Sequence, residues 1–302
     1  MTKELIEFIT RRKNELNALV VSHFYQLPEI QEVADFVGDS LQLARQAAET
    51  DAQVVVYCGV HFMAESAKIL SPNKTILLPE VNAGCPMADM ATGEALRAKK
   101  AEHPNSVVVS YVNTSAEVKA ETDICCTSSN AVSIVKSIPL DKEIIFVPDQ
   151  NLGSYIENQT GRKMIMWEGY CPIHNNLTVD EVMEQKRLHP EAKIVVHPEV
   201  PESVAHIADV VSSTSGILDY VKNSSDKEFI IGTEVGFLYT LSQHCPDKTF
   251  YIARPEFTCQ DMKVITLERL ANALDKLEHQ IEVPEDIRKK AYDSLDRMLK
   301  IT

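Results

Sequence analysis

The sequence predicts an α/β fold in which three similar three-layer α/β/α domains with parallel sheets surround a pseudo-threefold axis. Cysteines that follow an apolar strand recur 86 and 88 residues apart, at Cys85, Cys171 and Cys259. Polar residues at the ends of earlier strands recur 88 and 86 residues apart, at His23, Tyr111 and His197. Short runs rich in valine and isoleucine alternate with helical stretches, which is typical of parallel strands buried on both faces. We interpret the chain as an internal triplication.

Each unit is expected to contain a first, a middle and a last strand with helices between them. The first strands fall at residues 20–25, 108–113 and 195–200, the middle strands at 54–59, 143–148 and 228–233, and the last strands at 75–79, 163–167 and 248–252. A threonine with an acid two residues later marks a helix start at Thr2, Thr92 and Thr178. The units then span residues 1–88, 89–174 and 175–262, and helices within 263–302 are expected to pack on the first unit.

Composition narrows the class of protein. The chain has 302 residues, of which 44% are hydrophobic and 25% charged, as in ordinary globular proteins. A formal charge of −14 argues against nucleic acid or an anionic membrane as the main partner. The sequence has no apolar run long enough to span a bilayer, and its first residues do not resemble a signal peptide. A cytoplasmic location is therefore expected. Seven cysteines without a CxxC pair argue against a disulfide framework, and leave metal binding, catalysis or packing.

The three repeated cysteines favour a metal site shared by the three units. A [4Fe–4S] cluster on three thiolates keeps one iron without a protein ligand, and that iron can act as a Lewis acid on a substrate. A structural zinc with His174 as fourth ligand is the alternative, but such sites usually draw their ligands from close pairs. The remaining alternative is that all three pack in the core, which we expect for Cys58, within a strand, and for Cys245, on a helix. Cys125 and Cys126 are expected to pack around the loop that carries the second hydroxyl, Ser128.

Hydroxyl and acid–base side chains recur in the same register. A hydroxyl follows each polar strand end by seventeen residues, at Ser40, Ser128 and Thr214, and an aspartate by twelve, at Asp35, Asp123 and Asp209. One hydroxyl alone would be an ordinary helix cap, but three in register favour binding of carboxylate or phosphate groups. Residues two apart at a strand end point to the same side, which gives a possible acid–base set of His23, Tyr25, Tyr111, Asn113, His197 and Glu199.

These residues lie in blocks that resemble the quinolinate synthase family, the iron–sulfur enzymes of NAD biosynthesis. The resemblance extends along essentially the whole chain, in HFYQ, ADFVGDSLQLA, GVHFMAE, GCPMAD, YVNT, CTSSNAV, PDQNLG, GYCPIH, VHPE, STSG and GTEVG. In TCQDMK the match keeps little beyond cysteine, methionine and lysine, so Cys259 is assigned by its register.

The resemblance implies an enzyme that condenses iminoaspartate (iminosuccinate) with dihydroxyacetone phosphate to quinolinate, phosphate and two waters. It implies one [4Fe–4S] cluster per chain on Cys85, Cys171 and Cys259, and a functional link to an aspartate oxidase or dehydrogenase. The substrate-binding positions carried over are His23, Ser40, Tyr111, Val112, Asn113, Ser128, His174, His197, Pro198, Glu199 and Thr214. We expect catalytic roles for His23, Tyr25, Tyr111 and Glu199.

On this hypothesis Glu199 is the base and Tyr111 its partner, and burial raises the pKa of Glu199. Three other interpretations compete: a different iron–sulfur hydro-lyase of small acids, a non-catalytic ligand-binding protein with a structural zinc, and a solenoid-like scaffold. A product assay and metal analysis distinguish them.

Overall fold

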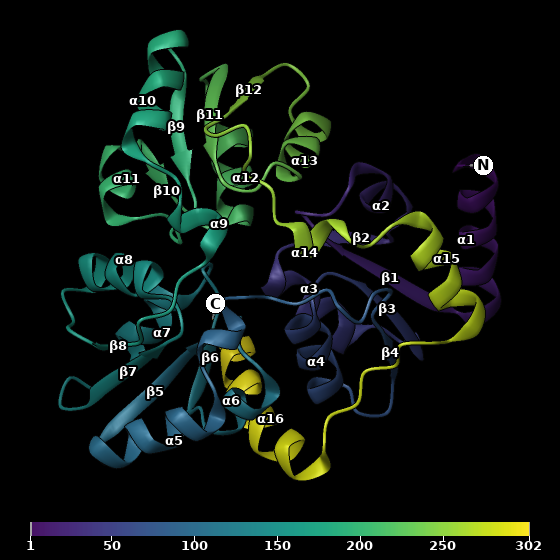
Figure 1. The fold of residues 1–302 in the computed structure, drawn as a ribbon, viewed down its shortest axis with the longest axis horizontal. Coiled ribbons are helices and arrows are strands. Elements are labelled where there is room, and N and C mark those ends of the chain that lie inside the picture. The colour runs from purple at the N-terminus through teal and green to yellow at the C-terminus, as the bar shows by residue number, and fades with distance from the viewer. Residues whose placement is uncertain (1, 302) are drawn as a thin grey trace.

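The computed structural model describes residues 2–301, which form three parallel four-stranded sheets around a common centre (Figure 1). The first sheet has the order β2-β1-β3-β4, the second β6-β5-β7-β8 and the third β10-β9-β11-β12. The strands are β1 (Ala18–His23), β2 (Phe36–Gly38), β3 (Val54–Cys58), β4 (Thr75–Leu77), β5 (Ser106–Tyr111), β6 (Ile124–Cys126), β7 (Glu143–Val147), β8 (Ile165–Met166), β9 (Lys193–Val196), β10 (Val210–Val211), β11 (Glu228–Gly232) and β12 (Thr249–Ile252). The predicted triplication is confirmed.

A helix precedes every strand, so each unit alternates helix and strand four times. The helices are α1 (Thr2–Leu16), α2 (Pro28–Val33), α3 (Ser40–Glu49), α4 (His61–Leu70), α5 (Gly93–Glu102), α6 (Ala116–Ala120), α7 (Ala131–Ser137), α8 (Gln150–Thr160), α9 (Pro172–Asn175), α10 (Val179–Leu188), α11 (Glu202–Ile207), α12 (Thr214–Asn223), α13 (Phe237–His244), α14 (Gln260–Lys263), α15 (Leu267–Lys276) and α16 (Glu285–Lys300). Thr92 and Thr178 cap α5 and α10 as predicted, whereas the side chain of Thr2 lies outside the described part.

Each sheet contains one short edge strand that the sequence pattern did not reveal. These strands, β2, β6 and β10, pair in parallel with β1, β5 and β9. They are two or three residues long, too short to show a period. Cys125 and Cys126 therefore lie on a strand, where they are buried, and not in a loop around the second hydroxyl.

The three repeated aspartates join the edge strands to the first strands. Each carboxylate accepts a 2.8 Å hydrogen bond from a backbone N–H of the first strand, in the pairs Asp35–Val20, Asp123–Val108 and Asp209–Ile194. The N–H of each aspartate donates to the carbonyl of the same partner residue. The repeat of these aspartates thus reflects sheet construction, at the opposite strand end from the polar residues.

A second repeated contact caps the C-terminal end of the helix that precedes each middle strand. A basic side chain donates to carbonyl oxygens at the C-terminal end of α3, α7 and α12, from Lys74, Arg162 and Lys248 respectively. Positive charge there satisfies unpaired carbonyls and complements the helix dipole.

The two last helices join different units. Helix α15 packs against α1 and β3 of the first unit, whereas α16 contacts α6 and β6 of the second unit as well as α4 of the first (Figure 1). The hydroxyl of Ser294 on α16 donates to the carbonyl of Lys119, and the Asn130 amide donates to the carbonyls of Met298 and Ile301. Strands of all three sheets share one buried core, while the division at residues 88, 174 and 262 stays a prediction.

None of the helices within residues 2–301 combines the length and apolar character needed to cross a bilayer.

The aspartate contacts give a stability prediction. Replacing Asp123 by alanine should lower the free energy of unfolding by about 1.5–3 kcal/mol, the usual size for a hydrogen bond to a charged group. Urea denaturation measures the change. Asp141→Ala, in an exposed turn, is the control and should have little effect. Equal denaturation midpoints for the two variants would contradict the structural role of Asp123.

Candidate active site

The strand ends of all three units converge on one cavity of about 100 Å³. The predicted site residues that line it are His23, Tyr25, Ser40, Cys85, Tyr111, Asn113, Ser128, Cys171, His174, His197, Glu199, Thr214 and Cys259. Within the described chain, Val112 and Pro198 lie outside this lining, because alternate residues of an extended segment face opposite sides. Pro198 instead lines a second cavity beside α8 and α11.

The three repeated cysteines enter the cavity from corresponding loops. Cys85 lies between β4 and a short 3₁₀ turn (Ala88–Met90), and Cys171 and Cys259 directly precede α9 and α14. Throughout residues 2–301 the cysteines are free thiols. Burial raises the pKa of Cys85 to about 12 and that of Cys259 to about 11, and burial with the nearby Glu199 raises the pKa of Cys171 well above its usual value. A metal bound here would displace protons from the thiols.

The other four cysteines are buried in the core, as expected for Cys58 and Cys245, whereas Cys125 and Cys126 lie on β6. Cys245 follows the end of α13 and does not lie on it.

A carboxylate holds the backbone of each cysteine loop. The N–H of Cys171 donates to Asp149 at 3.3 Å and that of Cys259 to Glu234 at 3.1 Å, while the N–H of Gly84 donates to Asp261 at 3.3 Å. Burial raises the pKa of both Asp149 and Glu234. No repeated pattern in the sequence singles out these residues, although Asp149 and Glu234 both follow a middle strand, in PDQNLG and GTEVG.

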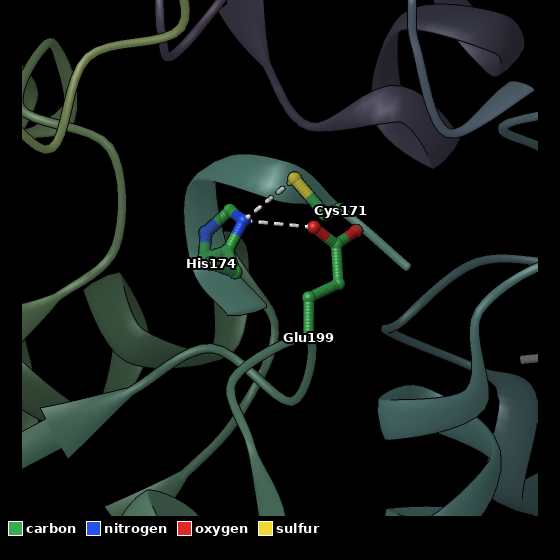
Figure 2. A group of neighbouring side chains, drawn as sticks. All are labelled: Cys171, His174 and Glu199. Carbon is green, nitrogen blue, oxygen red and sulfur yellow. Dashed lines mark hydrogen bonds and ion pairs between the residues drawn. The ribbon is translucent and has the colours of Figure 1, made fainter. Parts of the chain in front are cut away.

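Glu199 lies at the centre of a hydrogen-bond network drawn from two units. Its Oε2 is 2.9 Å from Nδ1 of His174, and the hydroxyl of Tyr111 donates to its Oε1 at 2.6 Å. The same Nδ1 is 3.2 Å from Sγ of Cys171 (Figure 2). Ligand atoms of Cys171, His174 and Glu199 all lie within 4.8 Å of one another, so this group has the composition and spacing to hold a metal ion.

The expected direction of the Glu199 pKa is wrong. Burial alone raises the pKa of this carboxyl, but the rings of His197 and His174 and the hydrogen bonds from His174 and Tyr111 outweigh it, so the pKa lies well below its usual value. Glu199 is therefore held as a carboxylate. Its partner Tyr111 has its pKa raised by burial and by Glu199, and stays a hydroxyl donor.

The repeated hydroxyls are adjacent to helix caps but are not the caps. Ser40 and Thr214 are the first residues of α3 and α12, which are capped by the side chains of Asp39 and Ser213. Ser128 lies in the turn before α7, with its hydroxyl 3.2 Å from Nε2 of His197. All three hydroxyls are thus placed to contact a ligand.

The side-chain oxygen of Asn113 indicates where a ligand would bind. Its buried Oδ1 lines the cavity and finds no hydrogen-bond partner among residues 2–301. A buried carbonyl oxygen without a donor is costly, so a ligand with an N–H or O–H group is expected here.

The buried Lys119 supports the loop that carries Asn113, since its ammonium donates to the carbonyls of Val112 and Thr114.

The fold and the cavity define an enzyme built from three α/β units, with one buried site that combines three thiols, a carboxylate and several imidazole and hydroxyl groups. A family model described as quinolinate synthetase A protein matches residues 7–300. The chain belongs to this family.

Proteins named quinolinate synthase are similar to this chain over its full length. The chain is 53% identical to the quinolinate synthase of Desulforudis audaxviator, covering 100% of this chain and 99% of that protein. It is 50% identical to the quinolinate synthase of Methanosarcina barkeri, covering 99% and 98%, and 50% identical to that of Dehalococcoides mccartyi, covering 100% of both.

The buried imidazoles predict loss of stability in acid. Burial lowers the pKa of His197 from 6.5 to about 4, so the unfolded chain binds more protons between these values and stability falls as the pH falls through them. One such ring contributes on the order of 3 kcal/mol by pH 4. His197→Gln should flatten the dependence measured by urea denaturation at several pH values, whereas His206→Gln, at an exposed position, should not. Parallel pH profiles for His197→Gln and the parent chain would refute this.

Proposed function

We propose that this enzyme condenses iminoaspartate with dihydroxyacetone phosphate to give quinolinate, phosphate and two waters, with a [4Fe–4S] cluster held by Cys85, Cys171 and Cys259. The observation that carries the proposal is the convergence of these three thiols, one from each unit, on the cavity lined by the acid–base residues. The names of the relatives support the product.

The donor set suits such a cluster. The three cysteines reach one cavity, and the other four are buried elsewhere in the core, which leaves three thiolates as ligands. When bound, the cluster supplies one iron without a protein ligand, which is a Lewis acid for oxygen or nitrogen atoms of a substrate.

The chain's own residues then bind and orient the two substrates. Ser40, Ser128 and Thr214 donate hydroxyl hydrogens to carboxylate and phosphate oxygens, helped by the free N–H groups where α3 and α12 begin. The Oδ1 of Asn113 accepts from a substrate N–H or O–H group. Burial lowers the pKa of His23 to about 3, so its ring is a neutral partner in this site.

Proton movement is assigned to Glu199 and Tyr111. Loss of two waters and tautomerisation to an aromatic ring require protons to leave carbon and nitrogen and to reach departing hydroxyls. The ionised Glu199 accepts a proton, and the Tyr111 hydroxyl, 2.6 Å away, donates one and is then reprotonated by Glu199. The low pKa of Glu199 makes its carboxylate a weak base, so it takes up a proton only from an acidic donor and passes that proton on at once.

The proposal extends to the cellular setting. Iminoaspartate hydrolyses in water, so an aspartate oxidase or dehydrogenase must supply it, and a cytoplasmic location would bring the two enzymes together.

A second candidate function is that of a mononuclear metal enzyme, because the group of Cys171, His174 and Glu199 has the spacing for a single ion.

Metal analysis and a product assay test the proposal on protein purified without oxygen. We expect about four irons and four acid-labile sulfides per chain, little zinc, and quinolinate formed from the two substrates. Cys85→Ser should lose the iron and the activity, whereas Cys245→Ala, at a buried position in the core, should keep both. About one zinc and no sulfide would favour the mononuclear site and overturn the cluster assignment.

The proposed role of Glu199 as a base predicts that its replacement lowers turnover without loss of the cluster. Glu199→Gln should keep the iron and sulfide content but lower kcat by about 10²-fold or more, because the amide cannot take up the proton. Steady-state quinolinate formation measures this. Glu256→Gln, whose side chain is 87% exposed, is the matched control. Normal turnover in Glu199→Gln would show that another group is the base.

A further inference from the structure

The hydroxyl of Thr233 connects two residues of the site from behind. Thr233 follows β11 and is fully buried. Its Oγ1 is 2.6 Å from the hydroxyl of Tyr25 and 2.9 Å from Nε2 of His174. Tyr25 comes from the first unit, His174 from the end of the second and Thr233 from the third, so one hydroxyl joins all three units beside the cavity.

The direction of these hydrogen bonds follows from the other ring nitrogen of His174. Nδ1 faces the Glu199 carboxylate at 2.9 Å and the sulfur of Cys171 at 3.2 Å, and a carboxylate can only accept. Nδ1 therefore carries the hydrogen; in the neutral form of the ring Nε2 accepts from the Thr233 hydroxyl, and in the charged form it donates to it. In either form the Thr233 hydroxyl can bond to both Nε2 and the Tyr25 hydroxyl, because it has one hydrogen to donate and two lone pairs that accept.

The contacts of Thr233 are not duplicated. Within residues 2–301, the Tyr25 hydroxyl and the Nε2 of His174 each have this hydroxyl as their one hydrogen-bond partner. Without it both groups are buried and unpaired, and the His174 ring loses the contact that selects its tautomer. The rings are close, with centroids 6.2 Å apart, so displacement of one affects the other.

We propose that Thr233 is a positioning residue for the reaction. It fixes the Nδ1–H form of His174, so that this ring donates to Glu199, and it holds the Tyr25 hydroxyl at the wall of the cavity. The inference rests on the proposed function, because it gives Thr233 a role in the chemistry assigned to Glu199. It concerns turnover, since Thr233 does not itself line the cavity and acts through Tyr25 and His174, which do.

Three variants separate the hydroxyl from its surroundings. Thr233→Val keeps the shape and removes the hydroxyl, and Thr233→Ser keeps the hydroxyl. Thr240→Val is the matched control, because Thr240 is also buried in the third unit and donates to Gln31 at 2.7 Å, away from the site. Each is assayed for kcat and KM of quinolinate formation and for iron and sulfide, and ¹⁵N–¹H spectra of the histidine rings report the tautomer of His174.

We expect Thr233→Val to lower kcat by about 10- to 100-fold, the usual effect of losing a partner behind a catalytic group, with KM changed less than about threefold. The spectra should show that His174 no longer holds a single Nδ1–H form. Thr233→Ser and Thr240→Val should resemble the parent chain in kcat and in tautomer.

Three results would overturn the inference: an unchanged kcat in Thr233→Val, an unchanged His174 tautomer, or an equal loss in Thr233→Ser, which would assign the effect to packing. If Thr233→Val does not fold, Thr233→Ala, which is too small to clash, carries the same expected losses. A parent chain that makes no quinolinate refutes the proposed function instead, and the tautomer measurement still decides the role of Thr233.

Discussion

One carboxylate, that of Asp39, joins all three units beside the hydroxyls that line the cavity. Its Oδ1 accepts the N–H of Gln42 and caps α3, while its Oδ2 accepts the hydroxyls of Ser129 at 2.8 Å and Ser215 at 2.5 Å. These serines belong to the second and third units. Because each partner is next to a hydroxyl that lines the cavity, the junction that holds the units together also sets the distances between the groups expected to bind substrate.

The site is complete only when all three units are assembled. Glu199, the ionised group at its centre, is compensated by donors from the second unit, and the thiols come one from each unit. A buried charge without such donors costs several kcal/mol, so an isolated unit would expose or neutralise these groups. The same contacts that make the chemistry possible therefore favour the assembled arrangement.

Features that repeat in all three units could be predicted from the sequence. Features that depend on contacts between units could not. The first, middle and last strands of the three sheets were predicted because β and α segments alternate regularly, and the repeated cavity residues because their offsets recur. The edge strands were too short to be seen. The pKa of Glu199 was predicted in the wrong direction, because burial can be expected from a sequence but the Tyr111 hydrogen bond, across 88 residues, cannot. Thr233 and Asp149 carried no repeated signal in all three units.

Helix α16 has a consequence for the order of events during synthesis. It packs under α6 and β6, where Ser294 contacts the Lys119 carbonyl, and Lys119 supports the loop that carries Asn113 (Figure 1). A ribosome releases the chain from the N-terminus, so the second unit emerges long before the helix that completes its core. The loop therefore acquires its final support only after α16 has been synthesised. The cavity wall that carries Asn113 is complete only from that moment.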